Sequence, residues 1–223
     1  VPVLRVDRGS TAKRDAMEAL LAGLGDRPGI LVGTQMLAKG HDLPGLTLVA
    51  VAGIDEGLFS ADFRASEKLA QLLVQVAGRA GRAERAGEVL LQTHHPEHPL
   101  LQVLVNGGYH AFAEAELAQR EAAGFPPFAH LALLRAEARH ADPPMQFLHA
   151  AKALLRDTGI AVHGPLPAPM PRRAGFLRTQ LLLSSEARPA LHAALDTVLP
   201  AIRETKEARK VRWSLDIDPV DLY

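Results

Sequence analysis

The segment Gly124-Phe125-Pro126-Pro127 divides this chain more sharply than any other feature of its sequence. A helical pattern runs from about His98 to Ala123 and must end at this segment, because proline lacks the backbone donor and clashes with the preceding turn. Apolar residues are spaced differently before and after it. We therefore expect two domains, residues 1–97 and residues 125–223, joined by one long helix over residues 98–124.

Short apolar runs separated by helical patterns characterise the first domain. A strand pattern covers residues 2–7, and Ser10-Thr11 then offers a helix cap before an amphipathic stretch that reaches Leu24. Further strands are expected at 30–32, 46–52 and 89–91, with a helix at 64–78. Continuous apolar runs of this length are typical of strands buried on both faces of a parallel sheet. The pattern predicts an α/β fold, a parallel sheet sandwiched by helices.

The second domain has a different order of elements. We expect strands at 129–138, 160–164, 175–184 and 210–218, with helices at 143–157 and 188–204. This βαββαβ order predicts a smaller, α+β, ferredoxin-like domain. Between its middle strands, residues 164–173 contain so many prolines that we expect an extended surface segment without regular structure.

The composition narrows the functional classes only slightly. Lys and Arg (25) balance Asp and Glu (25), so contact with nucleic acid requires a local basic face. The absence of cysteine excludes disulfides and thiolate metal sites in this chain. No apolar run is long enough to span a bilayer, which predicts a soluble, cytoplasmic protein without membrane partners. The chain opens on a strand pattern without Met, so we expect it to be a fragment of a longer protein.

Residues Gln75–Arg82, which read Q-x-x-G-R-x-G-R, form the strongest chemical motif. Two arginines three residues apart, each after a glycine, place two guanidinium groups on one surface. Guanidinium groups fork onto phosphate oxygens and suit the charge that develops on a transferring γ-phosphoryl group. A broken helix end with solvated arginines is the alternative, and Gln75 at this offset favours the motif.

Residues Gly33–Pro44 form a second motif directly after an expected buried strand. Thr34, Gly40 and Asp42 would bring a hydroxyl, a free backbone N–H and a carboxylate to the sheet edge, where α/β folds bind ligands. By itself such a loop is more often an ordinary turn. Its position ahead of the Q-x-x-G-R-x-G-R motif, with one strand and one helix between them, gives the pair its specificity.

The two motifs resemble motifs V and VI of superfamily 2 helicases. Longer stretches at 33–41, 58–65, 92–99 and 209–219 are similar to the bacterial replication-restart primosomal helicases, along almost the whole chain. The resemblance implies part of the second RecA-like helicase lobe followed by the C-terminal domain. It also implies an ATP-dependent 3′→5′ DNA helicase that recognises stalled forks and restarts replication through primosome assembly.

The resemblance assigns roles to the motif residues. It implies that Arg82 is the arginine finger, with Arg79 and Gln75 in the same catalytic network. Gly40 and Asp42 would line the nucleotide cleft, and Thr34 would hold a DNA phosphate.

ATP, Mg²⁺ and zinc are the cofactors implied for the full-length protein. This chain lacks a G-x-x-x-x-G-K-[ST] loop, an Asp-Glu-x-His box and the cysteines that would bind zinc. We expect the fragment itself to lack ATPase activity.

The second domain carries the expected DNA and partner contacts. Nine Lys or Arg against four acidic residues lie between Arg172 and Arg212, which suits phosphate binding without sequence preference. We expect Arg172, Arg173 and Arg178 to contact forked or single-stranded DNA. The resemblance implies that Arg188 and His192 help to receive the acidic tail of single-stranded DNA-binding protein, although the family has Gln where His192 stands. Other primosome proteins are further implied partners.

Alternatives stay open for the function and for several single residues. Another superfamily 2 translocase, of the branch-migration type, would share both motifs, and a non-catalytic DNA- or protein-binding module is the third class. His94, His95 and His98 invite a metal site, but the prolines among them favour a surface between the domains instead. Asp55 and Glu56 follow a strand directly and could face the motor cleft, but we expect a solvated turn there. Trp213 is expected in the core rather than at a base-stacking surface.

Overall fold

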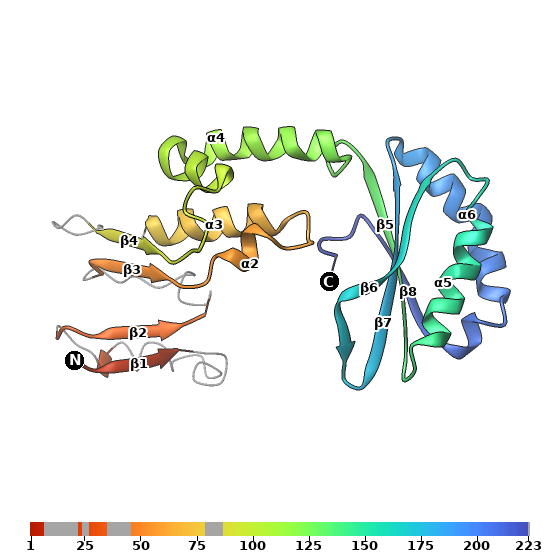
Figure 1. Ribbon diagram of the computed structural model, residues 1–223, viewed down its shortest axis with the longest axis horizontal. Helices are drawn as coiled ribbons and strands as arrows, with labels where there is room; N and C mark the ends of the chain where they lie inside the picture. The colour runs from red at the N-terminus through yellow and green to blue at the C-terminus, as the bar shows by residue number, and fades with distance from the viewer. Residues whose placement is uncertain (7–21, 24–26, 35–45, 79–86, 223) are drawn as a thin grey trace. The chain divides into compact units, whose positions relative to one another are not determined.

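The computed structural model describes residues 1–6, 22–23, 27–34, 46–78 and 87–222 (Figure 1). The chain divides into two compact units. Unit 1 comprises Val1–Phe59 and Ser66–Phe112, and unit 2 comprises Ser60–Ala65 and Ala113–Tyr223. A short segment from the first half of the sequence therefore belongs to the second unit.

Unit 1 contains two parallel strand pairs and three helices among its described residues. β1 pairs with β2, and β3 pairs with β4, each pair in parallel register. The elements are β1 (Val3–Val6), β2 (Ile30–Gly33), β3 (Leu48–Val51), α2 (Asp55–Leu58), α3 (Ala65–Ala77), β4 (Glu88–Leu91) and α4 (Pro99–Ala123). The first residue of α3 and the part of α4 from Ala113 onward belong to unit 2. The expected parallel α/β arrangement is confirmed, whereas the helix expected after Ser10-Thr11 lies outside the described residues except for 22–23.

The core of unit 1 is built by helices α3 and α4. Helix α3 buries Ala70, Leu73 and Val76, which follow helical spacing and share one face. The first turns of α4 bury a second apolar set, Leu100, Leu101 and Leu104. The helix predicted at 64–78 is confirmed.

The long helix between the two halves of the chain is broken. Gly108 within α4 has φ 75° and ψ −174°, a conformation that only glycine adopts readily, so the segment consists of two helical pieces. A single continuous helix was expected, and that prediction was wrong here. The Gly107-Gly108 pair was the available signal of the break, although the apolar spacing continues on both sides of it.

Unit 2 is a four-stranded antiparallel sheet with two helices. The strand order is β6-β7-β5-β8. The elements are β5 (His130–Ala138), α5 (Asp142–Leu154), β6 (Ala161–Arg173), β7 (Phe176–Ser185), α6 (Arg188–Glu204), the short 3₁₀ helix η2 (Ala208–Lys210) and β8 (Arg212–Ile217). The expected βαββαβ order is confirmed, and α6 has the predicted bounds.

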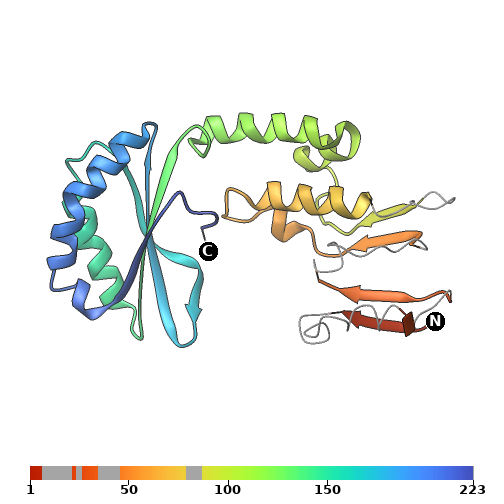
Figure 2. The ribbon, with the colours of Figure 1, turned by 180° about the vertical axis from the view of Figure 1, so that it is seen from behind.

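The sheet of unit 2 has a helix-covered face and an open face. Both views show α5 and α6 on the same side of the sheet (Figures 1 and 2). The covered face buries alternate residues of the central strands together with Phe147 of α5. Trp213 packs against this core at 5.6 Å from the Phe147 ring, which confirms its expected position. Side chains on the open face form a smaller apolar cluster of Phe63, Leu131, Leu133 and Leu222.

The proline-rich segment was predicted to lack regular structure, and this prediction was wrong. Residues 164–173 lie within β6, which pairs with β7 with register shifts between His163 and Leu166 and between Pro167 and Arg172. β6 is an edge strand, so the proline positions need not donate to a second neighbour. Most of the segment is exposed, as expected.

Candidate functional site

The C-terminal end of helix α3 carries the described part of the Q-x-x-G-R-x-G-R motif. Gln75 is exposed on its last turn, while Leu73 and Val76 are buried on the opposite side. The amphipathic pattern of α3 thus presents Gln75 to solvent. Arg79 and Arg82 lie outside the described residues.

The second motif begins where β2 ends. Thr34 directly follows Gly33 and is exposed, which leaves its hydroxyl accessible at the carboxyl end of this parallel strand. Gly40 and Asp42 lie outside the described residues. Among the predicted motor residues, therefore, the structure places Gln75 and Thr34.

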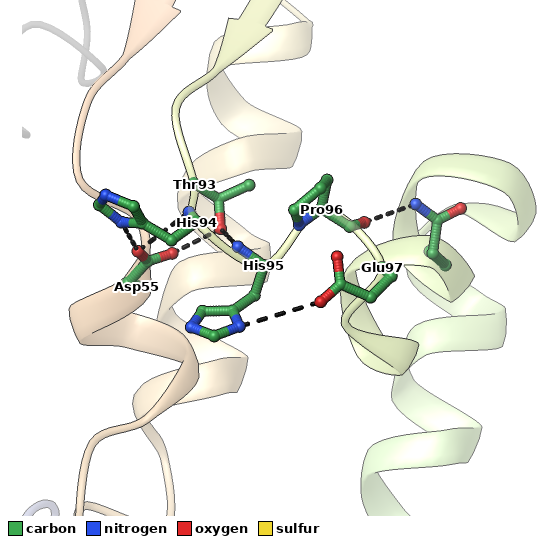
Figure 3. A network of polar contacts seen from close by, with 7 residues as sticks. Asp55, Thr93, His94, His95, Pro96 and Glu97 are labelled. Carbon is green, nitrogen blue, oxygen red and sulfur yellow. Dashed lines mark hydrogen bonds and ion pairs between the residues drawn. The ribbon is translucent and has the colours of Figure 1, made fainter.

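A polar network joins the carboxyl ends of β3 and β4. Because the two strands are parallel, Asp55 after β3 and Thr93-His94 after β4 meet at the same sheet edge (Figure 3). The Thr93 hydroxyl donates to Asp55 Oδ1 at 2.5 Å. The other carboxylate oxygen, Oδ2, lies 2.7 Å from His94 Nδ1 and accepts the His94 backbone N–H at 3.2 Å.

These hydrogen bonds favour the charged form of Asp55. The Thr93 hydroxyl and then the His94 ring hold the pKa of Asp55 at about 2, below its ordinary value of 3.8. The Thr93 hydroxyl also accepts the backbone N–H of His95 at 2.9 Å, which ties the turn after β4 together. With its Nδ1 directed at the carboxylate, the largely exposed His94 ring turns Nε2 toward solvent.

The sequence analysis underestimated this network. It treated Asp55 as a solvated turn and did not single out Thr93. The available signal was an Asp directly after one apolar run and a Thr-His pair directly after another, which parallel pairing brings together.

The next two histidines in the sequence, His95 and His98, make different contacts from His94. His95 and His98 meet the Phe59 ring edge-on, at centroid distances of 4.7 and 5.4 Å. His95 Nδ1 also lies 3.9 Å from Glu97 Oε1. Within the described ranges no group of three or more His, Cys, Asp or Glu side chains is arranged to hold a metal ion.

The candidate DNA-binding arginines of unit 2 lie along the β6–β7 hairpin. Arg172 and Arg173 are exposed beside a two-residue turn, Ala174-Gly175, in which both residues have positive φ. Arg178 on β7 differs, because its side chain is only 12% exposed and its Nε lies 3.9 Å from Glu137 Oε2. The hairpin therefore offers two accessible guanidinium groups and one that already has an acidic neighbour.

The predicted partner-binding residues lie on helix α6. Arg188 Nη2 contacts Asp218 Oδ2 at 2.5 Å, and the Arg188 side chain is still 59% exposed. His192 follows one turn later, and its Nε2 is buried without a hydrogen-bond partner in the described structure. An incoming carboxylate would have to share Arg188 with Asp218 or displace it.

Comparisons with known proteins match both halves of the chain. A family described as "Helicase conserved C-terminal domain" matches residues 2–84, and one described as "Primosomal protein N C-terminal domain" matches residues 121–220. The chain is 47% identical to the replication restart protein PriA of Haemophilus influenzae over 99% of its own length. It is 37% identical to the proteins of the same name from Bacillus subtilis and Treponema pallidum, over 97% and 94% of its length. The chain matches the C-terminal region of PriA replication restart proteins, a helicase C-terminal domain followed by a primosomal protein N C-terminal domain.

The chain spans 28 to 31% of the length of these PriA relatives, and it corresponds to their C-terminal part. The helicase match contains both motifs, and the PriA C-terminal match contains the sheet of unit 2. Thr93, His94 and most of helix α4 fall between the two matches. No helix in the described part of this PriA homologue is long and apolar enough to cross a membrane.

Proposed function

We propose that this chain supplies half of the motor and the C-terminal domain of an ATP-dependent 3′→5′ DNA helicase that restarts replication at stalled forks. One observation carries the proposal: a helicase C-terminal match with motifs V and VI is followed, in the same chain, by a PriA C-terminal match. The second match favours a replication-restart helicase over a branch-migration translocase.

Within the motor, the proposed chemistry is charge stabilisation at the γ-phosphoryl group. Arg82 acts as the arginine finger, and Arg79 holds phosphate beside it. Gln75, exposed at the end of α3, is accessible for orienting this network. Gly40 and Asp42 line the nucleotide cleft, and Thr34 binds a DNA phosphate.

The cofactors require residues beyond this chain. ATP and Mg²⁺ would be held mainly by a phosphate-binding loop that the sequence lacks. The arginines of motif VI fit the role of contributing from the opposite wall of the cleft. Zinc does not fit this chain, because the sequence has no cysteine and the described residues hold no group of potential ligands.

Unit 2 is proposed as the DNA- and partner-binding domain, with a ferredoxin-like plan. Its strand order and helix-covered face support that plan. Arg172 and Arg173 contact the phosphates of forked or single-stranded DNA, and Arg178 joins them when it leaves Glu137. Arg188 and His192 receive the acidic tail of single-stranded DNA-binding protein, and other primosome proteins act with this assembly. Because a protein that acts on chromosomal DNA is expected in the cytoplasm, a cytoplasmic location is part of this proposal.

The test is an assay of the full-length protein with forked DNA. We expect ATP turnover to rise when forked DNA is added, together with unwinding in the 3′→5′ direction. A four-way junction serves as the competing substrate. Preference for migrating that junction would favour the other translocase class, and DNA binding without any turnover would leave only a binding module.

A further inference from the structure

The segment Ser60–Ala65 leaves unit 1 and packs within unit 2, although both flanking stretches belong to unit 1. Its sequence position is inside the helicase match, which covers residues 2–84. Phe63 nevertheless lies in an apolar cluster with Leu131, Leu133 and Leu222 of the C-terminal half. A piece of the helicase sequence is thus built into the core of the other unit.

Four side chains hold this segment, and we call them the Phe63 clasp: Phe63, Glu116, Arg120 and Phe125. The Phe63 ring stacks on the Phe125 ring, with centroids 5.5 Å apart and an interplanar angle of 11°. The Arg120 guanidinium lies 5.5 Å from the Phe63 centroid, and its Nη2 donates to the Phe63 carbonyl at 3.2 Å. Arg120 Nε donates to Glu116 Oε1 at 3.1 Å.

The clasp is buried and geometrically specific. The side chains of Arg120 and Glu116 are only 10% and 9% exposed. A buried ion pair needs further hydrogen bonds to offset its lost hydration. The Arg120 guanidinium meets this need with three contacts. Its Nε donates to Glu116, its Nη2 donates to the Phe63 carbonyl, and its central carbon lies over the Phe63 ring. Lysine, with a single ammonium group, cannot make all three contacts.

Helix α3 starts at the clasp and ends in motif VI. The Asp62 carboxylate accepts the Arg64 backbone N–H at 3.2 Å, and the Asp62 carbonyl accepts that of Ala65, the first residue of α3, at 2.9 Å. The helix has 13 residues, a rigid rod of roughly 20 Å at 1.5 Å per residue. Gln75 lies on its last turn, so the position of Phe63 at one end constrains motif VI at the other.

We propose that Phe63 and Arg120 are positioning residues for ATP hydrolysis. They hold the segment from which α3 starts, and Gln75 lies on the last turn of that helix. The inference rests on the proposed helicase function and adds to it the connection between the two matched regions.

The experiment uses the full-length protein with the substitutions Phe63→Leu and Arg120→Lys. Displacement of a catalytic group by about 1 Å can lower a rate by up to 10²-fold, so we expect kcat for DNA-stimulated ATP turnover to fall 10- to 100-fold. KM for ATP should rise as well, because Arg79, which is proposed to hold phosphate, follows Gln75 in the same motif. The matched control is Leu222→Ala, which opens the same apolar cluster in a segment that does not lead to α3.

The outcomes separate positioning from general destabilisation. Lower kcat in both clasp variants, with normal kcat in the folded Leu222→Ala protein, supports the inference. Normal kcat in the clasp variants, or an equal loss in Leu222→Ala, overturns it while leaving the helicase proposal intact. Absence of DNA-stimulated turnover in the unsubstituted protein instead contradicts the helicase proposal. If Phe63→Leu does not fold, Arg120→Lys decides the question, because it keeps the charge beside Glu116.

Discussion

Arg79 and Arg82 are three residues apart in one motif, yet the proposed chemistry gives them unequal tasks. In the full-length protein, Arg82→Ala should reduce DNA-stimulated ATP turnover by roughly 10³-fold, because an arginine finger acts on charge that develops in the transition state. The affinity for ATP should hardly change, since the ground state uses this contact little. Steady-state turnover and nucleotide-binding titrations measure the two effects.

The neighbouring residue supplies the comparison. Arg79→Ala should also slow turnover, but with a visible loss of ATP affinity, as expected for a side chain that holds phosphate throughout. Arg82→Lys should restore little activity, because an ammonium group keeps the charge and loses the fork. Normal turnover in Arg82→Ala would remove the assignment of the finger.

The ionisation of Asp55 gives a second prediction for single side chains. Thr93→Val removes the largest cause of its low pKa, so the pKa should rise from about 2 toward 3.8. Carboxyl carbon NMR of the chain across an acid titration measures this shift. Because the folded-state pKa is depressed, the charged network stabilises the fold above pH 3.8 and loses its effect as pH falls toward 2.

Thr197→Val is the matched control for this titration. Its hydroxyl donates to the Ala193 carbonyl on α6, far along the chain from Asp55. The Asp55 midpoint should not move in that variant. An unchanged midpoint in Thr93→Val would mean that the Thr93 hydroxyl does not stabilise the carboxylate.

At the scale of elements, the break in α4 is set by one residue. Gly108→Ala should lower the free energy of unfolding by about 1 to 3 kcal/mol, because its backbone conformation is accessible almost only to glycine. No atom lies within 4 Å of a Cβ built at this position, so the effect should come from the backbone alone. Denaturant unfolding of the chain measures it, with the exposed Val105→Ala of the same helix as the control. A stabilised Gly108→Ala protein would indicate a continuous helix.

The β6–β7 hairpin carries a further prediction. Charge reversal at both Arg172 and Arg173 should flatten the dependence of log K on log salt for single-stranded DNA by about 1.4, or roughly 0.7 per lost phosphate contact. Arg178→Glu should change the slope less, because Glu137 already neighbours that side chain. Charge reversal at two other exposed arginines, Arg156 and Arg203, changes the net charge by the same amount and serves as the control. If the hairpin variant keeps its slope, the DNA is bound elsewhere.

The sequence predicted where helices and strands occur better than it predicted where they break or how far they extend. Helix α6 was predicted at its observed bounds, because Pro189 suits its first turn and apolar residues repeat at helical spacing up to Ile202. A strand was predicted at 160–164, but its proline-rich continuation to Arg173 was missed, since proline argues against a strand only where a neighbouring strand needs its N–H. That condition depends on the strand order, which local sequence does not contain.

For the whole molecule, the chain contains both C-terminal helicase motifs but no phosphate-binding loop. We expect these 223 residues alone to show no ATP turnover above background, with or without DNA. A micromolar titration with ATP should likewise reveal no binding, because one wall of the cleft is absent. The full-length protein under the same conditions is the control, and DNA-stimulated turnover by the short chain would contradict this prediction.

For the whole molecule, the sequence did not predict which residues far apart in the chain contact each other. The family and both motifs followed from local residue patterns, as did the βαββαβ order. The Asp55–Thr93 bond joins residues 38 apart, and the Arg120–Phe63 bond joins residues 57 apart. The Asp55–Thr93 pairing could be expected only once β3 and β4 are known to be parallel, and the Arg120–Phe63 pairing has no local spacing signature.

The prolines of β6 also bear on how this protein behaves in a crowded solution. Edge strands expose unpaired N–H groups that can recruit strands from other chains. Pro165, Pro167, Pro169 and Pro171 have no backbone N–H, so this edge strand carries fewer donors than a strand without proline. This edge strand therefore offers fewer donors to a strand from a second copy of the chain.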